Sequence, residues 1–239
     1  RKEATGFGVI YFVNEMLNYH GQSFENKRVV ISGSGNVAIY AAEKAIDYGA
    51  KVVAMCDSSG YIVDENGIDL SIVKQIKEVE RNRIKEYIAR KEGAQYFEGQ
   101  KGIWTVKCDI ALPCATQNDI NLDDAKILVE NGTTVIGEGA NMPCTNEAVK
   151  YFLEKGLLVA PAKAANAGGV ATSALEMTQN SMRLSWSFEE VQAKQEKAMK
   201  KAFDAIWAIK EEYGVDMRTA AYMSSIKRVA DAMKRRGWY

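Results

Sequence analysis

The sequence has only three prolines, four cysteines and one histidine among its 239 residues. The cysteines form no CxxC pair and His20 is the lone histidine, so we expect no metal site. A few thiols in a chain of this length are typical of a reducing compartment, and we therefore expect a cytoplasmic protein. No apolar run approaches the 18 residues of a membrane-spanning helix, so we expect no membrane partner.

The sequence also lacks an excess of charge of either sign, because 31 lysines and arginines balance 31 aspartates and glutamates. A protein that binds nucleic acid by neutralising phosphates normally carries a basic surplus, so we expect no nucleic-acid partner. Hydrophobic residues make up 47% of the chain. That content predicts a packed core and excludes a disordered acidic chain.

Short β-branched runs alternate with amphipathic stretches along most of the chain. The alternation predicts an α/β fold with a doubly wound, mostly parallel sheet, because parallel strands need helical crossovers. The expected strands are 28–32, 51–56, 61–63, 109–112, 133–136 and 157–160. The expected helices are 8–19, 39–48, 70–90, 122–130, 146–155, 168–180, 187–213 and 216–235.

A glycine-rich loop, Gly33-Ser-Gly-Asn-Val-Ala38, joins the first expected strand to a helix. It fits the pattern GxGxxA, in which glycines permit a tight turn and a close approach of the backbone to a pyrophosphate. The next strand ends at Asp57, about 20 residues beyond Ala38, as in Rossmann-like dinucleotide-binding units. The alternative is an ordinary tight turn. The candidate phosphate-binding residues are Gly33, Ser34, Gly35, Asn36 and Val37.

The residues around Asp57 leave the choice between NAD and NADP open. An acidic side chain here can accept a hydrogen bond from a ribose 2′-hydroxyl, which favours NAD. A 2′-phosphate would need cations, and Lys77 and Arg81 share one face of the expected helix 70–90 because they are four residues apart. Charged runs of this kind are also typical of a solvated helix face.

Three further loops carry residues suited to binding. Asn118 and Asn141 follow expected strands, and their amides can bind ribose hydroxyls or a carboxamide, or can close Asx turns. Gly168 and Gly169 begin a helix whose N-terminus favours an anion, although they can also provide flexibility alone. Ser173, in the same helix, is either a ligand or a serine bonded back to its own helix.

Five motifs together resemble the cofactor-binding domain of hexameric, bacterial-type glutamate dehydrogenases. They are Arg1-Lys-Glu-Ala-Thr-Gly-Phe-Gly8, the 33–38 loop, Leu112-Pro-Cys-Ala-Thr-Gln-Asn118, Glu138-Gly-Ala-Asn-Met-Pro143 and Lys163-Ala-Ala-Asn-Ala-Gly-Gly-Val170. The resemblance covers the whole chain, and the substrate domain of that family would precede Arg1. It implies reversible oxidative deamination of L-glutamate to 2-oxoglutarate and ammonia with NADP(H), in a homohexamer.

The resemblance also implies roles for individual residues. Asp57 and Ser58, followed by Lys77 and Arg81, look like the NADP-using members, so we expect NADP with NAD as the alternative. The implied cofactor-binding residues are Thr5, Gly33, Ser34, Gly35, Asn36, Val37, Asp57, Ser58, Lys77, Arg81, Ala115, Thr116 and Asn141. The implied substrate-binding residues are Asn166, Gly168, Val170 and Ser173, the last reaching the side-chain carboxylate.

The domain division and the catalytic residues follow from the same resemblance. We expect a Rossmann-like dinucleotide-binding domain over 1–186 and a helical segment over 187–239 that packs on it or on the substrate domain. The family's catalytic lysine and aspartate lie in that other domain, so we expect no catalytic residue here and little turnover by this chain alone. We interpret Cys114 as a packed thiol and Lys163 as structural.

Two other functions stay open at this point. A leucine- or phenylalanine-type amino-acid dehydrogenase would share the cofactor fold but would need an apolar pocket where Ser173 offers a hydroxyl. A non-catalytic dinucleotide-binding module would need no substrate domain.

Overall fold

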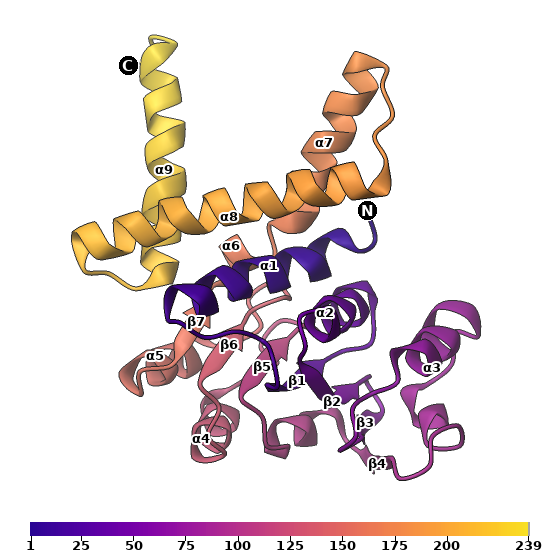
Figure 1. Ribbon diagram of the computed structural model, residues 1–239. Coiled ribbons are helices and arrows are strands. Elements are labelled where there is room, and N and C mark those ends of the chain that lie inside the picture. The colour runs from indigo at the N-terminus through magenta and orange to yellow at the C-terminus, as the bar shows by residue number, and fades with distance from the viewer. Residues whose placement is uncertain (239) are drawn as a thin grey trace.

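The computed structural model describes residues 1–238, which form a sheet covered by helices on both faces (Figure 1). The strand order is β4-β3-β2-β1-β5-β6-β7. The pairs β2–β1, β1–β5, β5–β6 and β6–β7 are parallel, whereas β3 and β4 extend one edge in antiparallel pairs. The expected α/β fold with a mostly parallel sheet is therefore confirmed. The strands are β1 (Arg28–Ser32), β2 (Lys51–Cys56), β3 (Gly60–Val63), β4 (Gln95–Glu98), β5 (Ile110–Pro113), β6 (Val135–Gly137) and β7 (Leu158–Ala160).

Side chains that cap the helix N-termini set several of the helix boundaries. Asn121 and Ser187 form capping boxes, and the Asp216 carboxylate accepts from the first backbone amides of the last helix. The helices are α1 (Ala4–Tyr19), α2 (Asn36–Asp47), α3 (Leu70–Lys74), α4 (Leu122–Glu130), α5 (Asn146–Glu154), α6 (Ala162–Ala165), α7 (Gly168–Met182), α8 (Phe188–Tyr213) and α9 (Met217–Arg235). No helix among residues 1–238 combines the length and the apolar character needed to cross a membrane.

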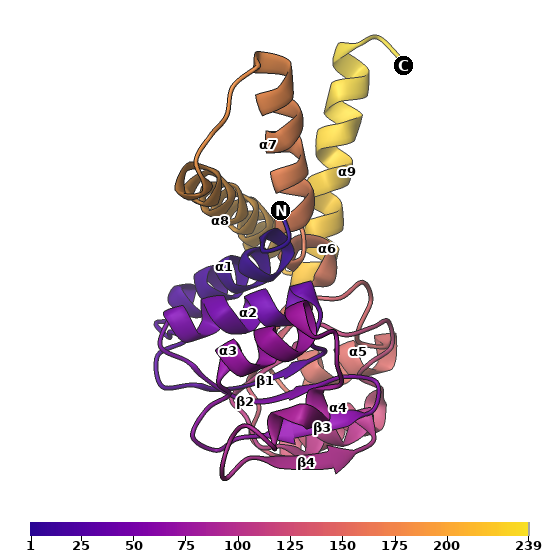
Figure 2. The same cartoon turned by 90° about the vertical axis from the view of Figure 1, so that its right-hand side faces the viewer.

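The sheet separates two hydrophobic cores. Figure 2 shows the helices that cover its two faces. Val29 and Ile31 of β1 face the core formed with α1 and α2. Val30, between them, faces the core formed with α4 and α5. Successive strand residues point to opposite faces, so a strand covered on both sides must be apolar throughout. This explains the continuous run of apolar residues in β1.

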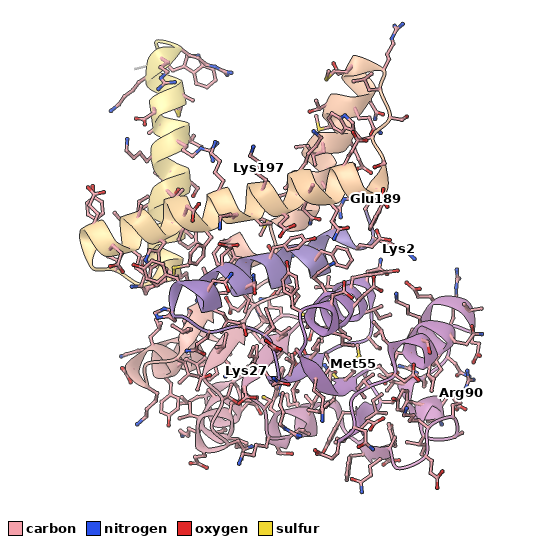
Figure 3. All side chains as sticks on the ribbon, viewed as in Figure 1. Lys2, Lys27, Met55, Arg90, Glu189 and Lys197 are labelled. Atoms are coloured by element: carbon pink, nitrogen blue, oxygen red, sulfur yellow. The ribbon has the colours of Figure 1, made fainter. Side chains whose placement is uncertain are left out.

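The C-terminal helices add a further layer beyond α1. Helix α8 lies along α1, while α7 and α9 project away from the sheet (Figures 1 and 2). Met199 and Phe203 on the inner face of α8 are buried, and Phe203 packs edge-on against Phe12 of α1 with ring centroids 5.4 Å apart. Lys197, on the opposite face, points outward between the projecting helices (Figure 3).

The expected helix over 70–90 is wrong. Helix α3 ends at Lys74, a π-helical turn covers Gln75–Val79, and a short 3-10 helix covers Ile84–Tyr87. The chain reverses at Arg81, which adopts a φ of 55°. The reversal brings Ile84 and Tyr87 into the core, and burial of these side chains outweighs the propensity of the charged run for a regular helix. Strand β4 was not expected, and α1 begins four residues earlier than expected.

An ion pair between a buried carboxylate and a half-buried arginine connects the sheet to α9. Glu138 follows β6 and is fully buried. Its two carboxylate oxygens accept from Arg218 Nη2 at 3.1 and 3.2 Å, and Oε2 also accepts from the Ala162 amide at 2.9 Å. The single carboxylate therefore joins β6, α6 and the first turn of α9.

We predict that Arg218→Ala lowers the free energy of unfolding by about 2 to 3 kcal/mol, because it leaves a buried carboxylate without its counter-charge. Guanidinium-chloride unfolding measures the effect. Arg228→Ala, at an exposed position of the same helix, is the matched control and should stay within about 0.5 kcal/mol of the parent. Equal losses in the two variants would show that the pair does not stabilise the fold.

Candidate functional site

The candidate site lies at the carboxyl edge of the sheet, between β1 and β5. The chain leaves β1 toward β2 on one side and later returns to β5 on the other, so the loops after these strands diverge and leave a crevice. A cleft of about 670 Å³ opens there. Seven of the predicted site residues line this cleft, namely Thr5, Val37, Ala115, Thr116, Asn141, Asn166 and Val170.

The glycine-rich loop borders the cleft and fits an anionic bridge. Gly33 has a φ of 92°, and a Cβ at this position would lie 3.2 Å from the Ala115 backbone. Gly35 has open space where a Cβ would stand, and no side chain caps the N-terminus of α2. The first backbone amides of α2 are thus available to a ligand at the positive end of the helix dipole. These features suit the pyrophosphate of a dinucleotide.

The far end of the cleft is built from the loops after β6 and β7. Asn166 Nδ2 donates to Asn141 Oδ1 at 2.9 Å, which joins the two loops. Thr5 lies in the first turn of α1, and its hydroxyl is so close to Gly169 that a side chain there would collide with it. Arg1 and Lys163 also line the cleft and bring positive charge. The sequence interpretation had assigned neither cation to the site, although both belong to its motifs.

Gly168 and Ser173 lie beside the cleft lining. Gly168 is buried, and a Cβ there would come within 2.7 Å of Gly8 Cα, so the glycine permits the close crossing of α7 and α1. Ser173 Oγ donates to the Gly169 carbonyl oxygen at 3.3 Å, the local bond that was one of the two alternatives. Ser173 Oγ also accepts from Arg1 Nε at 2.9 Å. Ser173 is thereby coupled to the cleft through Arg1.

Asp57 stands at the other end of the site with both carboxylate oxygens occupied. Oδ1 accepts from the Ser59 amide at 2.9 Å and the Ser59 hydroxyl at 2.6 Å. Oδ2 accepts from the Ile84 amide at 2.8 Å and Lys77 Nζ at 3.3 Å. Burial alone would raise the pKa of Asp57, but these hydrogen bonds and the Lys77 charge outweigh it and lower the pKa. The carboxylate is a charged anchor for the surrounding loops.

The cations near Asp57 differ from the expected pair. Lys77 and Arg81 do not share a helix face, because the chain leaves the helix between them and Arg81 lies in the left-handed region. Arg83 instead reaches back, and its Nη1 donates to Ser58 Oγ at 2.6 Å. Periodicity could not have selected Arg83, since the segment is not a regular helix. The only signal in the sequence was its place in the same basic run.

The cysteine thiols are buried and free. Burial raises the pKa of Cys56 to about 12 and raises that of Cys114, which touches the cleft, still further. A thiol held in its protonated form is a poor nucleophile, so the geometry agrees with a packing role for Cys114. Among residues 1–238 no group of three or more histidine, cysteine or acidic side chains is arranged to hold a metal ion.

We predict that Asp57→Asn destabilises the fold by about 2 kcal/mol at pH 7, because charged hydrogen bonds are lost. The folded-state pKa is lowered below the ordinary value of 3.8, so the stabilisation is present above that value and is lost as the pH falls through the folded-state pKa. Urea unfolding of parent and variant at pH 7 and pH 3 should therefore show a smaller difference at pH 3. A difference of the same size at both pH values would contradict an ionised anchor.

The chain is similar over nearly its whole length to known dehydrogenases. It is 49% identical over 245 residues to the NADP-specific glutamate dehydrogenase of Salmonella typhimurium, covering 99% of this chain and 54% of that protein. It is 47% identical over 248 residues to the NAD(P)-specific glutamate dehydrogenase of Xylanibacter ruminicola, covering 100% and 54%. The crystal structure of Plasmodium falciparum glutamate dehydrogenase superposes with a TM-score of 0.95 at 40% identity, covering 98% of this chain and 51% of that one.

The chain thus spans about half the length of the curated relatives it matches. The model of the glutamate/leucine/phenylalanine/valine dehydrogenase family matches residues 1–237. The glycine-rich loop at the β1–β5 crevice and the asparagine-lined cleft beside it both lie within the matched residues. The chain belongs to the glutamate/leucine/phenylalanine/valine dehydrogenase family.

Proposed function

We propose that this chain is the NADP(H)-binding part of a glutamate dehydrogenase, an enzyme that interconverts L-glutamate with 2-oxoglutarate and ammonia. The observation that carries the proposal is a continuous run of binding groups along the carboxyl edge. It begins at Ser58 and Arg83, passes the open N-terminus of α2, and ends in the cleft lined by Asn141 and Asn166. A dinucleotide is an elongated ligand with a charged bridge at its centre, and this order of groups suits it.

The preference for NADP over NAD rests on the hydrogen bonds at Asp57. Both of its oxygens already accept two bonds, so the carboxylate is poorly placed to accept another from a free ribose 2′-hydroxyl. The Ser58 hydroxyl and the Arg83 guanidinium are both exposed, and an arginine is a strong partner for a phosphate. Lys77 compensates the charge of Asp57, which would otherwise repel a 2′-phosphate. Arg81, which the sequence analysis expected to bind the cofactor, has no comparable contact with Ser58.

The nicotinamide half is assigned to the cleft. In this proposal Thr5, Ala115, Thr116 and Asn141 hold the carboxamide and its ribose, and the bound nicotinamide supplies the hydride acceptor for the substrate α-carbon. Asn166, Gly168, Val170 and Ser173 flank the substrate. The chain's own contribution is to bind and orient, because the catalytic lysine and aspartate are assigned to the preceding domain.

The charge of the cleft favours an acidic substrate over an apolar one. Arg1 and Lys163 line it, and Arg1 Nε binds Ser173 Oγ at 2.9 Å. A carboxylate suits these groups, whereas the side chain of leucine or phenylalanine would leave them without a polar partner. The charge of the cleft therefore favours a glutamate dehydrogenase over a leucine- or phenylalanine-type amino-acid dehydrogenase.

The domain division, the assembly and the compartment proposed for the protein are those expected from the sequence. Residues 1–186 form the dinucleotide-binding domain and 187–239 the helical segment, whose last residue lies outside the described part of the chain. The whole protein assembles as a homohexamer, and its compartment is the cytoplasm. The buried free thiols suit a reducing compartment. Light scattering of the whole protein measures the assembly.

We predict that Arg83→Ala weakens NADPH binding about tenfold, because a charge-assisted contact to the 2′-phosphate is lost. NADH binding should change less than twofold. Arg81→Ala removes the same charge two residues away and serves as the matched control, with both ligands expected to bind as in the parent. Isothermal titration calorimetry measures all six affinities. A larger effect of Arg81→Ala than of Arg83→Ala would contradict the assignment of Arg83 and would support Lys77 and Arg81 as the cations at the 2′-phosphate.

We predict further that the 239-residue chain binds NADPH saturably but forms little NADPH from NADP and glutamate, because the catalytic groups are assigned elsewhere. Calorimetry measures the binding, and absorbance at the reduced-nicotinamide band measures turnover. A chain that binds neither dinucleotide would refute the proposed function. Rapid turnover by this chain would place the catalytic groups within it.

A further inference from the structure

A buried serine ties the two cofactor loops together. Ser32 is the last residue of β1, directly before Gly33, and it is completely buried. Its hydroxyl oxygen accepts from the backbone amides of Cys114 at 3.0 Å and Ala115 at 3.2 Å. It donates to Asp119 Oδ2. One side chain on the strand before the glycine-rich loop thus holds the start of the loop after β5.

The three bonds use the full capacity of the hydroxyl. A serine hydroxyl has two lone pairs and one hydrogen. The two amides occupy the lone pairs, so the hydrogen must point elsewhere, and Asp119 receives it. Without that acceptor the hydroxyl could rotate, and one amide would then lose its partner in a buried position. Such a loss destabilises the local arrangement.

Asp119 is itself held firmly. It is only 4% exposed, and its carbonyl oxygen accepts from Trp104 Nε1 at 3.3 Å. The neighbouring amides of Asn118 and Ile120 donate to the Met142 and Pro143 carbonyl oxygens, each at 2.9 Å. The carboxylate therefore projects from a segment fixed to the loop after β6. Asp119 belongs to the same connection between β5 and α4 as Cys114, but its end of that connection is anchored by contacts outside it.

The loop ordered in this way stands against the phosphate loop. A Cβ on Gly33 would meet the Ala115 Cα at 3.2 Å, so the two loops are in close contact. Ala115 and Thr116 line the cleft. A small displacement of Cys114 and Ala115 would consequently change the shape of the cleft while leaving Ser58 and Arg83, on the other side of the phosphate loop, in place.

We propose that Asp119 is a positioning residue for the nicotinamide half of the cofactor site, acting through the Ser32 hydroxyl on the Cys114–Thr116 loop. The proposal rests on the proposed function, because it needs a dinucleotide in the cleft. A general structural role would affect binding of both halves of the dinucleotide, whereas a positioning role affects binding of the nicotinamide half alone. The adenosine half, bound by Ser58, Arg83 and the N-terminus of α2, is independent of Asp119.

The test compares a whole dinucleotide with its adenosine half in the same chain. The ligands are NADPH and adenosine 2′,5′-bisphosphate, titrated by calorimetry into the parent, Asp119→Ala, Asp119→Asn and Ser32→Ala. Asp119→Ala and Ser32→Ala should bind NADPH about tenfold more weakly and the bisphosphate within about twofold of the parent. Asp119→Asn keeps an acceptor oxygen of the same size and should bind both ligands nearly as the parent does.

A matched control removes an acidic side chain nearby. Asp123 lies at an exposed position four residues after Asp119. Asp123→Ala should leave the affinities for NADPH and for the bisphosphate unchanged. If the parent itself binds no NADPH, the proposed function fails and not this inference alone. If the parent binds while both alanine variants weaken the two ligands equally, or weaken neither, Asp119 has no positioning role. Should Asp119→Ala fail to fold by circular dichroism, Ser32→Ala decides between the same outcomes.

Discussion

The parallel pairing of β1 with β2 on one side and β5 on the other brings the whole site together. Ile31 pairs with Met55 and with Leu112, so these three strands end at one edge in matching register. The glycine-rich loop, the turn that carries Ser58 and the loop after β5 all leave from that edge. Because β1 is buried on both faces, a one-residue slip would move Val29 and Ile31 from one core into the other and would disrupt the packing of both. The position of the glycine-rich loop is thereby fixed by the core.

Buried carboxylates then fix the positions of loops near this edge of the sheet. Asp57 holds the turn after β2 and the segment around Ile84, Glu138 holds α6 and α9, and Asp119 holds the Ser32 hydroxyl. Each satisfies its charge or its lone pairs through named donors, as a buried acidic group must. Loops fixed in this way keep their positions before any ligand arrives. Binding then requires little ordering of the chain, which favours affinity.

Local sequence determined some parts of this architecture and distant contacts determined the others. The bounds of β1 and β2 agree with the sequence expectation, because short β-branched runs between a glycine loop and turn residues have few alternatives. The prediction for the segment after Lys74 was wrong because its charges suggested a solvated helix. The burial of Ile84 and Tyr87 depends instead on tertiary contacts with β3 and α3, which helical periodicity does not report. For the same reason Arg83, one of the cations in the same basic run, was not selected. Its contact with Ser58 exists only once the chain has reversed at Arg81.

The two expected units of the chain also depend on one another at the site. Thr5 and Arg1 reach the cleft from the start of α1, and the position of that helix end is set by contacts with the C-terminal half. Gln195 of α8 donates to the Ala4 carbonyl oxygen, and Phe203 of the same helix packs against Phe12 of α1. A boundary at residue 186 therefore divides the sequence but not the binding surface. If Thr5 engages the dinucleotide as proposed, the packing of α8 against α1 would influence binding without a contact between α8 and the ligand.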